Sequence, residues 1–276
     1  MRTMTSLLAL ALTASLAQAA KVDVFPGSGT PLQDAIDAAG DGDSLVVHAG
    51  TYAEAVVVTK PLRIRGTPVN SSVVIDPGCS ASAALTVASD DVKLQELQVQ
   101  GGTFFAVDVQ NRTRVSISTV QLQDTCGGAE YGINVYQSTR VKLSRNDPYG
   151  FEDAGIYIGG IPAQGRVRVT KSTINPGNVR GIIVEDSLPG AVIVDQNRIS
   201  GPSVSGIFLH NSDGVKVRRN EVQGSFGTGI ELDADSDDNQ ILRNVLSNNA
   251  TDVVDAGAGN CWRGNDFTTG SVARCP

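Results

Sequence analysis

Gly132-Ile133-Asn134-Val135 is the first of five copies of a short motif that decides the fold of this chain. The later copies are Gly155-Ile156-Tyr157-Ile158, Gly181-Ile182-Ile183-Val184, Gly206-Ile207-Phe208-Leu209 and Gly229-Ile230-Glu231-Leu232. The first glycines of successive copies are 23, 26, 25 and 23 residues apart. A repeat of this length, made of short alternating strands, is typical of a chain that winds into a solenoid.

Two further segments follow each copy of the motif. The first is another alternating strand, as in Val141-Lys142-Leu143. A polar residue comes three positions later, and an apolar residue two positions after it marks a third short strand. The polar positions are Asn146, Ser172, Asn197, Asn220 and Asn244. We expect these side chains to stack as a ladder that bonds each coil to the next. The alternative is that they serve only as turn formers.

Three strands per coil, with apolar side chains alternating toward one face, predict an all-β chain. The expected fold is a single-stranded right-handed parallel β-helix with three sheets and about seven to nine coils. The same frame persists upstream over residues 85–117 without the glycines, and residues 260–267 form a degraded final coil.

The two ends of a solenoid need covers, because open strand edges pair with other chains. Leu32 and Ile36 have helical spacing and follow Pro31, which predicts a short N-terminal capping helix over residues 30–40. The β-helix domain is expected to span residues 20–276, with a disulfide-clipped C-terminal end over residues 260–276.

The N-terminal part of this domain resembles a known superfamily. The stretches Gly42-Asp43-Ser44-Leu45-Val46-Val47-His48-Ala49-Gly50-Thr51-Tyr52 and Pro61-Leu62-Arg63-Ile64-Arg65-Gly66 resemble the start of the pectin-lyase-like superfamily of right-handed parallel β-helices. The later repeats are similar to the parallel β-helix repeat that is also found in NosD-like proteins. The resemblance covers roughly residues 22–267 and implies the fold, but it says little about function, since one fold hosts many sites.

The catalytic motifs of the enzymes in this superfamily do not occur in the sequence. It lacks the Asp-Pro-His-Asp of mannuronan epimerases and the Gly-His-Gly with paired aspartates of polygalacturonases. It also lacks a convincing arginine and calcium-carboxylate set of the pectate-lyase kind. No active site can therefore be transferred residue by residue.

The first 19 residues predict export. They carry Arg2, a leucine-rich apolar run and the small-residue exit Ala17-Gln18-Ala19, which together are typical of a secretory signal peptide over residues 1–19. No other stretch has the length and apolar character of a membrane span. The mature protein is therefore expected to be secreted or periplasmic, with no membrane insertion.

The four cysteines form an even set, as expected in an oxidising compartment. Cys261 and Cys275 are close in sequence and predict a local disulfide. Cys79 and Cys126 then pair by exclusion, although they lie roughly two coils apart, which is ~10 Å by strand spacing and longer than a disulfide normally spans. Bent loops would close that gap; free or buried thiols are the alternative.

The charge of the chain argues against nucleic-acid partners. Removal of the signal peptide takes Arg2 from the 22 basic residues and leaves 21 against 29 acidic ones, a net charge of −8. Binding to nucleic acid or anionic membranes is driven largely by clustered positive charge. A local basic stripe on the outer face of the second sheet, made of Lys93, Lys142, Arg168 and Lys216, is either such a patch or an ordinary solvated face.

The outer face of the first sheet is the candidate functional surface, because the residue after each inward isoleucine points outward. We call this surface the ribbon; it comprises Asp108, Gln110, Asn134, Tyr136, Tyr157, Ile183, Glu185, Phe208, His210, Glu231 and Asp233. Aromatic rings pack on sugars, while carboxylates, amides and imidazole bond hydroxyls or move protons. The ribbon thus predicts a polysaccharide partner, and the expected exposure of Ile183 and Phe208 calls for a cover; an ordinary sheet surface shielded by loops is the alternative.

Within the ribbon, His210, Tyr157 and Glu185 are the candidate catalytic residues. Neighbouring carboxylates are expected to favour protonated His210 and to set up an acid/base pair. The candidate substrate-binding residues are Asp108, Asn134, Tyr136, Phe208 and Glu231. If the protein is an enzyme, the expected class is a uronate lyase or C5-epimerase. The alternatives are a non-catalytic adhesin-like scaffold that binds a protein partner, and a glycoside hydrolase that uses two ribbon carboxylates.

No cofactor is required by this hypothesis, but calcium is an alternative. Asp233, Asp235 and Asp237 alternate oxygen ligands in a turn as calcium loops do, although the glycine and the distal glutamate of an EF-hand are missing. An acidic turn without an ion is the other interpretation. Two distant histidines and disulfide-bonded thiols leave few ligands for other metals, which weakens the analogy with copper-centre assembly by NosD-like proteins.

Overall fold

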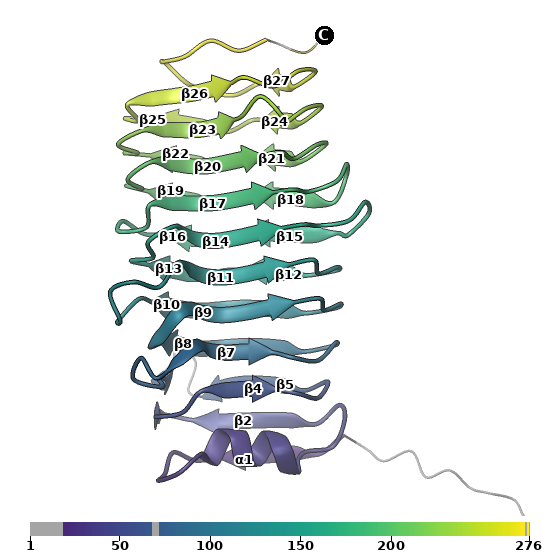
Figure 1. The fold of residues 1–276 in the computed structure, drawn as a ribbon, viewed down its shortest axis with the longest axis vertical. Helices are drawn as coiled ribbons and strands as arrows, with labels where there is room; N and C mark the ends of the chain where they lie inside the picture. The colour runs from purple at the N-terminus through teal and green to yellow at the C-terminus, as the bar shows by residue number, and fades with distance from the viewer. Residues whose placement is uncertain (1–18, 68–71, 274, 276) are drawn as a thin grey trace, which may run out of the picture.

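The computed structural model describes residues 19–67, 72–273 and 275, and within them the chain winds into a parallel β-helix (Figure 1). The predicted signal peptide lies outside the described residues except for its last position. The first sheet consists of β4 (Val56–Val58), β7 (Ala81–Val87), β9 (Gly102–Gln110), β11 (Tyr131–Tyr136), β14 (Ala154–Gly159), β17 (Arg180–Glu185), β20 (Ser205–His210), β23 (Thr228–Leu232) and β26 (Thr251–Asp255).

The second and third faces complete each coil. The second sheet runs through β1 (Lys21–Val24), β2 (Ser44–His48), β5 (Arg63–Thr67), β8 (Lys93–Gln100), β10 (Ser116–Gln123), β12 (Lys142–Ser144), β15 (Val167–Thr170), β18 (Val192–Asp195), β21 (Lys216–Arg218), β24 (Gln240–Leu242) and β27 (Cys261–Arg263). The third face is formed by β3 (Gly50–Tyr52), β6 (Val73–Ile75), β13 (Asp147–Tyr149), β16 (Thr173–Ile174), β19 (Arg198–Ser200), β22 (Glu221–Gln223) and β25 (Val245–Ser247). The long strands β8 and β10 join the second sheet to the third face.

The predicted three-sheet β-helix is confirmed, but the predicted number of coils was too low. Eleven strands follow one another along the second sheet in the described part of the chain, against the expected seven to nine coils. The additional coils lie at the N-terminal end, where β1, β2 and β5 stack in parallel register without the Gly-Ile motif. A sequence count that relies on the motif misses them.

The repeated glycines are explained by close approach of adjacent coils. A Cβ atom on Gly132 would lie 2.4 Å from the carbonyl oxygen of Gly155, and one on Gly181 would lie equally close to that of Gly206. The same clash, at 2.6 Å, recurs from Gly229 to Asp252. The coil above occupies the position of a side chain at this corner, so only glycine lets the strands stack there.

The predicted asparagine ladder is also confirmed. Asn220 Oδ1 accepts hydrogen bonds from Asn197 N (2.9 Å) and Nδ2 (3.0 Å) of the coil below. Its own Nδ2 donates to Val194 O (3.0 Å) and to Asn244 Oδ1 (3.0 Å). The same pattern continues from Asn244 to Asn265. All of these residues except Asn265 are buried, so the ladder satisfies backbone groups that no water reaches.

The predicted N-terminal cap is α1 (Pro31–Ala38), which lies across the first coil at one end of the stack (Figure 1). Leu32 and Ile36 are fully buried in the apolar core. The carboxylate of Glu54, from the following coil, accepts hydrogen bonds from Leu32 N and Gln33 N, both at 2.9 Å. This side chain thereby satisfies two free amides at the start of the helix. No helix among the described residues is long and apolar enough to cross a membrane.

The C-terminal end is held by the buried carboxylate of Asp252 in β26. Its Oδ2 accepts hydrogen bonds from Thr268 N (2.8 Å), Thr268 Oγ1 (3.0 Å) and Thr269 N (3.0 Å), and its Oδ1 accepts one from Asn249 Nδ2 (2.9 Å). Burial by itself raises the pKa of Asp252, but these bonds outweigh it and hold the pKa below the ordinary value of 3.8.

We expect Asp252→Asn to lower the free energy of unfolding by about 2 kcal/mol at neutral pH. The NH₂ group of asparagine is a hydrogen-bond donor, and it would face the N–H and O–H groups that now donate to the carboxylate. A lowered pKa stabilises the fold above the unfolded-state value and loses that contribution as the pH falls below about 3.8. The difference between wild type and variant, measured by chemical denaturation, should therefore shrink in acid. The control is Asp266→Asn, at an exposed position of the same end. Equal losses for both variants would refute the role of Asp252.

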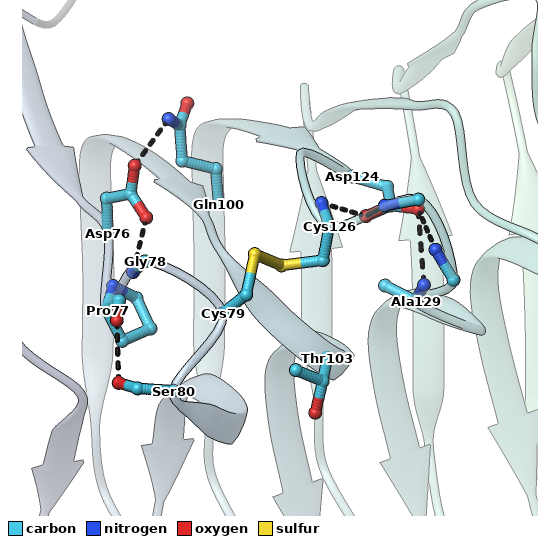
Figure 2. Close-up of a disulfide and its surroundings, with 12 residues drawn as sticks. Asp76, Pro77, Gly78, Cys79, Ser80, Gln100, Thr103, Asp124, Cys126 and Ala129 are labelled. Atoms are coloured by element: carbon cyan, nitrogen blue, oxygen red, sulfur yellow. Dashed lines mark hydrogen bonds between the residues drawn. A yellow bond between two sulfur atoms is a disulfide. The ribbon is translucent and has the colours of Figure 1, made fainter.

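Both disulfides are present, Cys79 with Cys126 and Cys261 with Cys275. Figure 2 shows how the first one bridges two loops that belong to non-adjacent coils. Asp124 folds the loop of Cys126 by accepting bonds from four successive amides, those of Cys126 to Ala129. Asp76 accepts one such bond, from Gly78 N, in the loop of Cys79.

The coil that lies between these two loops has only a tight turn at the corresponding position. Only Gly101 separates β8 from β9, at a φ of 77°, and a Cβ there would lie 2.1 Å from Asp76 Oδ1. Because this turn is so short, the loops on either side meet across it, and the Cα atoms of the two cysteines are 5.7 Å apart. The expected ~10 Å gap between coils is thus closed by the loops, as the pairing by exclusion requires.

Candidate functional site

The strand register gathers the predicted ribbon into two columns on the first sheet. One column runs through Asp108, Asn134, Tyr157, Ile183, Phe208 and Glu231. The other runs through Gln110, Tyr136, Gly159, Glu185 and His210, with Asp233 following on the next coil. All candidate catalytic and substrate-binding residues therefore share one surface.

His210 lies between two carboxylates on the flanking coils. Its Nδ1 hydrogen bonds to Asp233, and its Nε2 is 3.8 Å from Glu185 Oε1. With Nδ1–H donating to Asp233, Nε2 is the nitrogen that is free to accept a proton. Burial raises the pKa of Asp233, but bonds from Ser236, His210 and the Asn211 amide outweigh it, so this pKa lies below its ordinary value. Asp233 thus stays ionised and orients the ring.

Tyr157 joins this group through a hydrogen bond to Glu185. Its ring lies over Gly159 of the same strand, where a Cβ would lie only 2.5 Å from the hydroxyl oxygen. Burial raises the pKa of Tyr157, and its hydrogen bond to Glu185 raises it further. The hydroxyl is therefore protonated at neutral pH, which suits a proton donor rather than a base.

A second tyrosine, which the sequence analysis did not single out, supports this arrangement. The ring of Tyr131 is centred 4.7 Å from that of Tyr157, and its hydroxyl donates to Asp153 Oδ2 (3.0 Å). Burial and the charge of Asp153 raise its pKa as well. Together with Phe105, which stacks on Tyr131 at 6.0 Å, the two rings form an aromatic platform on neighbouring coils.

Arg180, the first residue of β17, is the cation of the site and was also missed. Its Nη1 is 2.6 Å from Asp153 Oδ1, and its guanidinium lies 5.4 Å from the ring centroid of Phe208. Its Nε is buried and has no hydrogen-bond partner among the described residues. The sequence analysis followed residues after each Gly-Ile pair, whereas Arg180 immediately precedes Gly181. The position of an arginine directly before Gly181 was the feature of the sequence that could have indicated a role for Arg180.

Not every ribbon residue is as accessible as expected. Ile183 is only 5% exposed, so the prediction that it lies exposed was wrong; aromatic Tyr157 and Phe208 occupy the flanking positions of its column. Asn134 is 4% exposed and donates to Asp108 Oδ1 at 2.7 Å. Tyr136, by contrast, is 37% exposed to solvent.

Two of the three candidate calcium ligands, Asp233 and Asp237, have separate partners. Asp233 binds His210 and accepts a bond from Ser236 Oγ (2.6 Å), while Asp237 Oδ1 accepts one from Ala258 N (2.6 Å). Asp235 is exposed. Calcium binding by this turn remains a prediction.

A protein-family model described as periplasmic copper-binding protein (NosD) matches residues 66–273. Copper sites use imidazole and sulfur ligands. Here His48 and His210 lie on different sheets, and all four cysteines form disulfides. Within the described ranges no group of three or more His, Cys, Asp or Glu residues is placed to hold a metal ion. The described residues therefore do not fit a copper site.

Similar solved structures include polysaccharide lyases and an epimerase of the same fold. A mannuronic acid specific polysaccharide family 6 lyase from the human gut microbiota aligns with a TM-score of 0.63 at 14% identity, over 89% of this chain and 64% of that one. A pectate lyase, Pel9A, aligns with a TM-score of 0.59 at 11% identity, over 92% and 82%. The Azotobacter vinelandii mannuronan C-5 epimerase AlgE4 A-module aligns with a TM-score of 0.53 at 15% identity, over 84% and 78%.

At these identities the structural similarity establishes the parallel β-helix and no more. No curated protein sequence matches the chain. The family match, by contrast, covers well over half of the residues, including all five Gly-Ile repeats. The chain belongs to the NosD family.

Proposed function

We propose that this protein is an exported β-helix protein that binds a polysaccharide along the ribbon and acts on it as a uronate lyase or C5-epimerase. The observation that carries the proposal is the line Glu185, His210 and Asp233 on three successive coils, with Tyr157 bonded to Glu185. A base oriented by a half-buried carboxylate, next to a protonated hydroxyl, is what proton transfer at a sugar ring needs.

The chemistry can be assigned to these groups. His210 Nε2 removes the proton from C5 of a uronate, and the electrons of the broken C5–H bond move into the adjacent carboxylate. In elimination the C4–O bond then breaks, a C4–C5 double bond forms, and the leaving oxygen takes the proton of the Tyr157 hydroxyl. In epimerisation the Tyr157 hydroxyl instead gives its proton to C5 from the face opposite His210. Arg180, whose guanidinium lies over Phe208 of the ribbon, is the cation that we assign to stabilise the enolate charge.

Three further observations support a carbohydrate partner and an exported protein. The similar solved structures include lyases and an epimerase that act on uronate polymers. Both disulfides, together with a family described as periplasmic, fit an exported protein. The aromatic platform of Tyr131 and Tyr157 offers the flat faces on which sugar rings pack.

The test is to incubate the mature protein with alginate, pectate, hyaluronan and neutral glycans, with calcium or with chelator. Unsaturated product is followed by ultraviolet absorbance, reducing ends by colorimetry, and C5 inversion by NMR. We expect activity on one uronate polymer, and a loss of at least about 100-fold in kcat/KM for His210→Ala and for Tyr157→Phe.

Matched controls are His48→Ala and Tyr149→Phe, which change the same residue types on the second sheet and the third face. They should retain activity. If His210→Ala and Tyr157→Phe also retain it, the site is misplaced. If no glycan is converted and none is bound, the non-catalytic scaffold is favoured instead.

A further inference from the structure

The second sheet carries a concentration of positive charge that the acidic composition conceals. Two successive coils each bear three cations, one in the turn before the strand, one in the strand and one in the turn after it. We call these six residues the basic face; they are Arg140, Lys142, Arg145, Arg166, Arg168 and Lys171. All six are exposed, and none forms an ion pair with another residue in the described part of the chain.

The register stacks these cations on one another. Lys142 lies directly opposite Arg168 in the parallel pair β12 and β15. The flanking turns stack as well, since Arg145 N donates to Thr170 O (3.1 Å). Successive coils are about 4.8 Å apart, and like charges directly opposite one another destabilise a sheet.

The third face of the same solenoid handles charge in the opposite way. There Arg198 lies opposite Glu221, and the two side chains form an ion pair at 2.8 Å. Stacked positions of this solenoid therefore do not always carry like charges. On the basic face Arg145 and Lys171 share a hollow with Glu96 and Asp147, whereas no acidic residue among the described ones lines the hollow around Lys142, Arg166 and Arg168. The missing countercharge around these three cations points to a ligand that supplies it.

The shape of the surface fits an extended polymer. A hollow of about 640 Å³ is lined by Lys142, Arg166 and Arg168 together with apolar residues, so that every charged residue in its lining is a cation. Toward the C-terminal end a second hollow of about 580 Å³ lies on the same sheet. Its basic lining residues are Arg243 and Arg263, together with Arg218 and Arg219, which both pair with Asp195.

We propose that the basic face binds a linear anionic polysaccharide, with its acidic groups on the stacked cations. The rise per coil is close to the length of one sugar unit, so the charges of two successive units can meet Lys142 and Arg168 on their two coils. Hydroxyl residues of the neighbouring column, Ser118, Ser144 and Thr170, are available to bond sugar hydroxyls. The strand columns of this face carry no aromatic ring over residues 116–218, so it lacks the stacking platform that single-stranded nucleic acids require.

This site is separate from the ribbon, because the basic face belongs to the second sheet and the ribbon to the first. It does not depend on the proposed catalysis. A polymer held on the basic face would keep the protein on its substrate while the ribbon acts elsewhere on the chain, which is an avidity effect.

The test compares two variants with the same net charge. The first is Lys142→Gln with Arg166→Gln and Arg168→Gln; the control is Thr59→Glu with Ser200→Glu and Ser247→Glu, at non-buried positions away from the basic face. Binding to polygalacturonate, to dextran and to single-stranded DNA is measured at several salt concentrations, after thermal melts confirm that both variants fold. We expect wild type to bind polygalacturonate but not dextran, the first variant to bind about tenfold more weakly with a shallower salt dependence, and the control to match wild type.

The proposal fails if polygalacturonate does not bind at low salt, or if the first variant binds as well as the control does. DNA binding as tight as that of polygalacturonate would overturn the assignment to a carbohydrate. The double variant Tyr157→Phe with His210→Ala must lose less affinity for polygalacturonate than the triple variant of the basic face does. An equal or larger loss would place the binding on the ribbon rather than on the basic face.

Discussion

Replacement of both Cys79 and Cys126 by serine is expected to lower the free energy of unfolding by about 4 kcal/mol. The disulfide joins residues 47 positions apart, and the entropy that a cross-link removes from the unfolded chain grows with the size of the loop it closes. The two loops would remain folded by Asp76 and Asp124, so the loss reports the cross-link itself (Figure 2). Guanidinium denaturation of wild type and variant measures it.

The second disulfide provides the comparison. Cys261 and Cys275 are 14 positions apart, which predicts a smaller loss of about 3 kcal/mol for Cys261→Ser with Cys275→Ser. If the two double variants lose equal stability, or if reducing agent leaves the wild-type transition unchanged, the Cys79–Cys126 cross-link does not stabilise the fold in this way.

Asn220→Ala is expected to cost about 3 kcal/mol, the next largest effect. Alanine removes the acceptor of Asn197 N and Nδ2 and the donor to Val194 O, and no water can replace them because the position is buried. Each unsatisfied buried group costs about 1–3 kcal/mol, and the lost side chain also leaves a small cavity.

The control for the ladder is Gln240→Ala, which removes an amide from an outward position of β24. We expect a change within about 0.5 kcal/mol for this variant. Thermal and chemical denaturation should rank the two variants clearly. Similar small losses for both would mean that the asparagines act as turn formers and that the ladder adds little.

The sequence was a good guide to the site wherever position along the strand decides which way a side chain points. Tyr157, Glu185 and His210 were placed on one surface by alternation and by the spacing of the motif, and the parallel register brings them together as expected. The same reasoning could not find Arg180. Its role depends on Asp153 and Phe208, which come from the coils on either side and are fixed only when the coils stack.

The sequence by itself determined the coil. Each Gly-Ile repeat, each second strand and each asparagine recurs at nearly constant spacing, so local pattern alone sets the register of one coil on the next. Tertiary structure decided what depends on contacts between loops or between outward side chains. It determined the pairing of Cys79 with Cys126 across the short turn at Gly101, the burial of Ile183 and the unpaired charges of the basic face. The physical reason is that strand register propagates through the backbone, whereas loop paths and charge partners depend on which side chains meet in space.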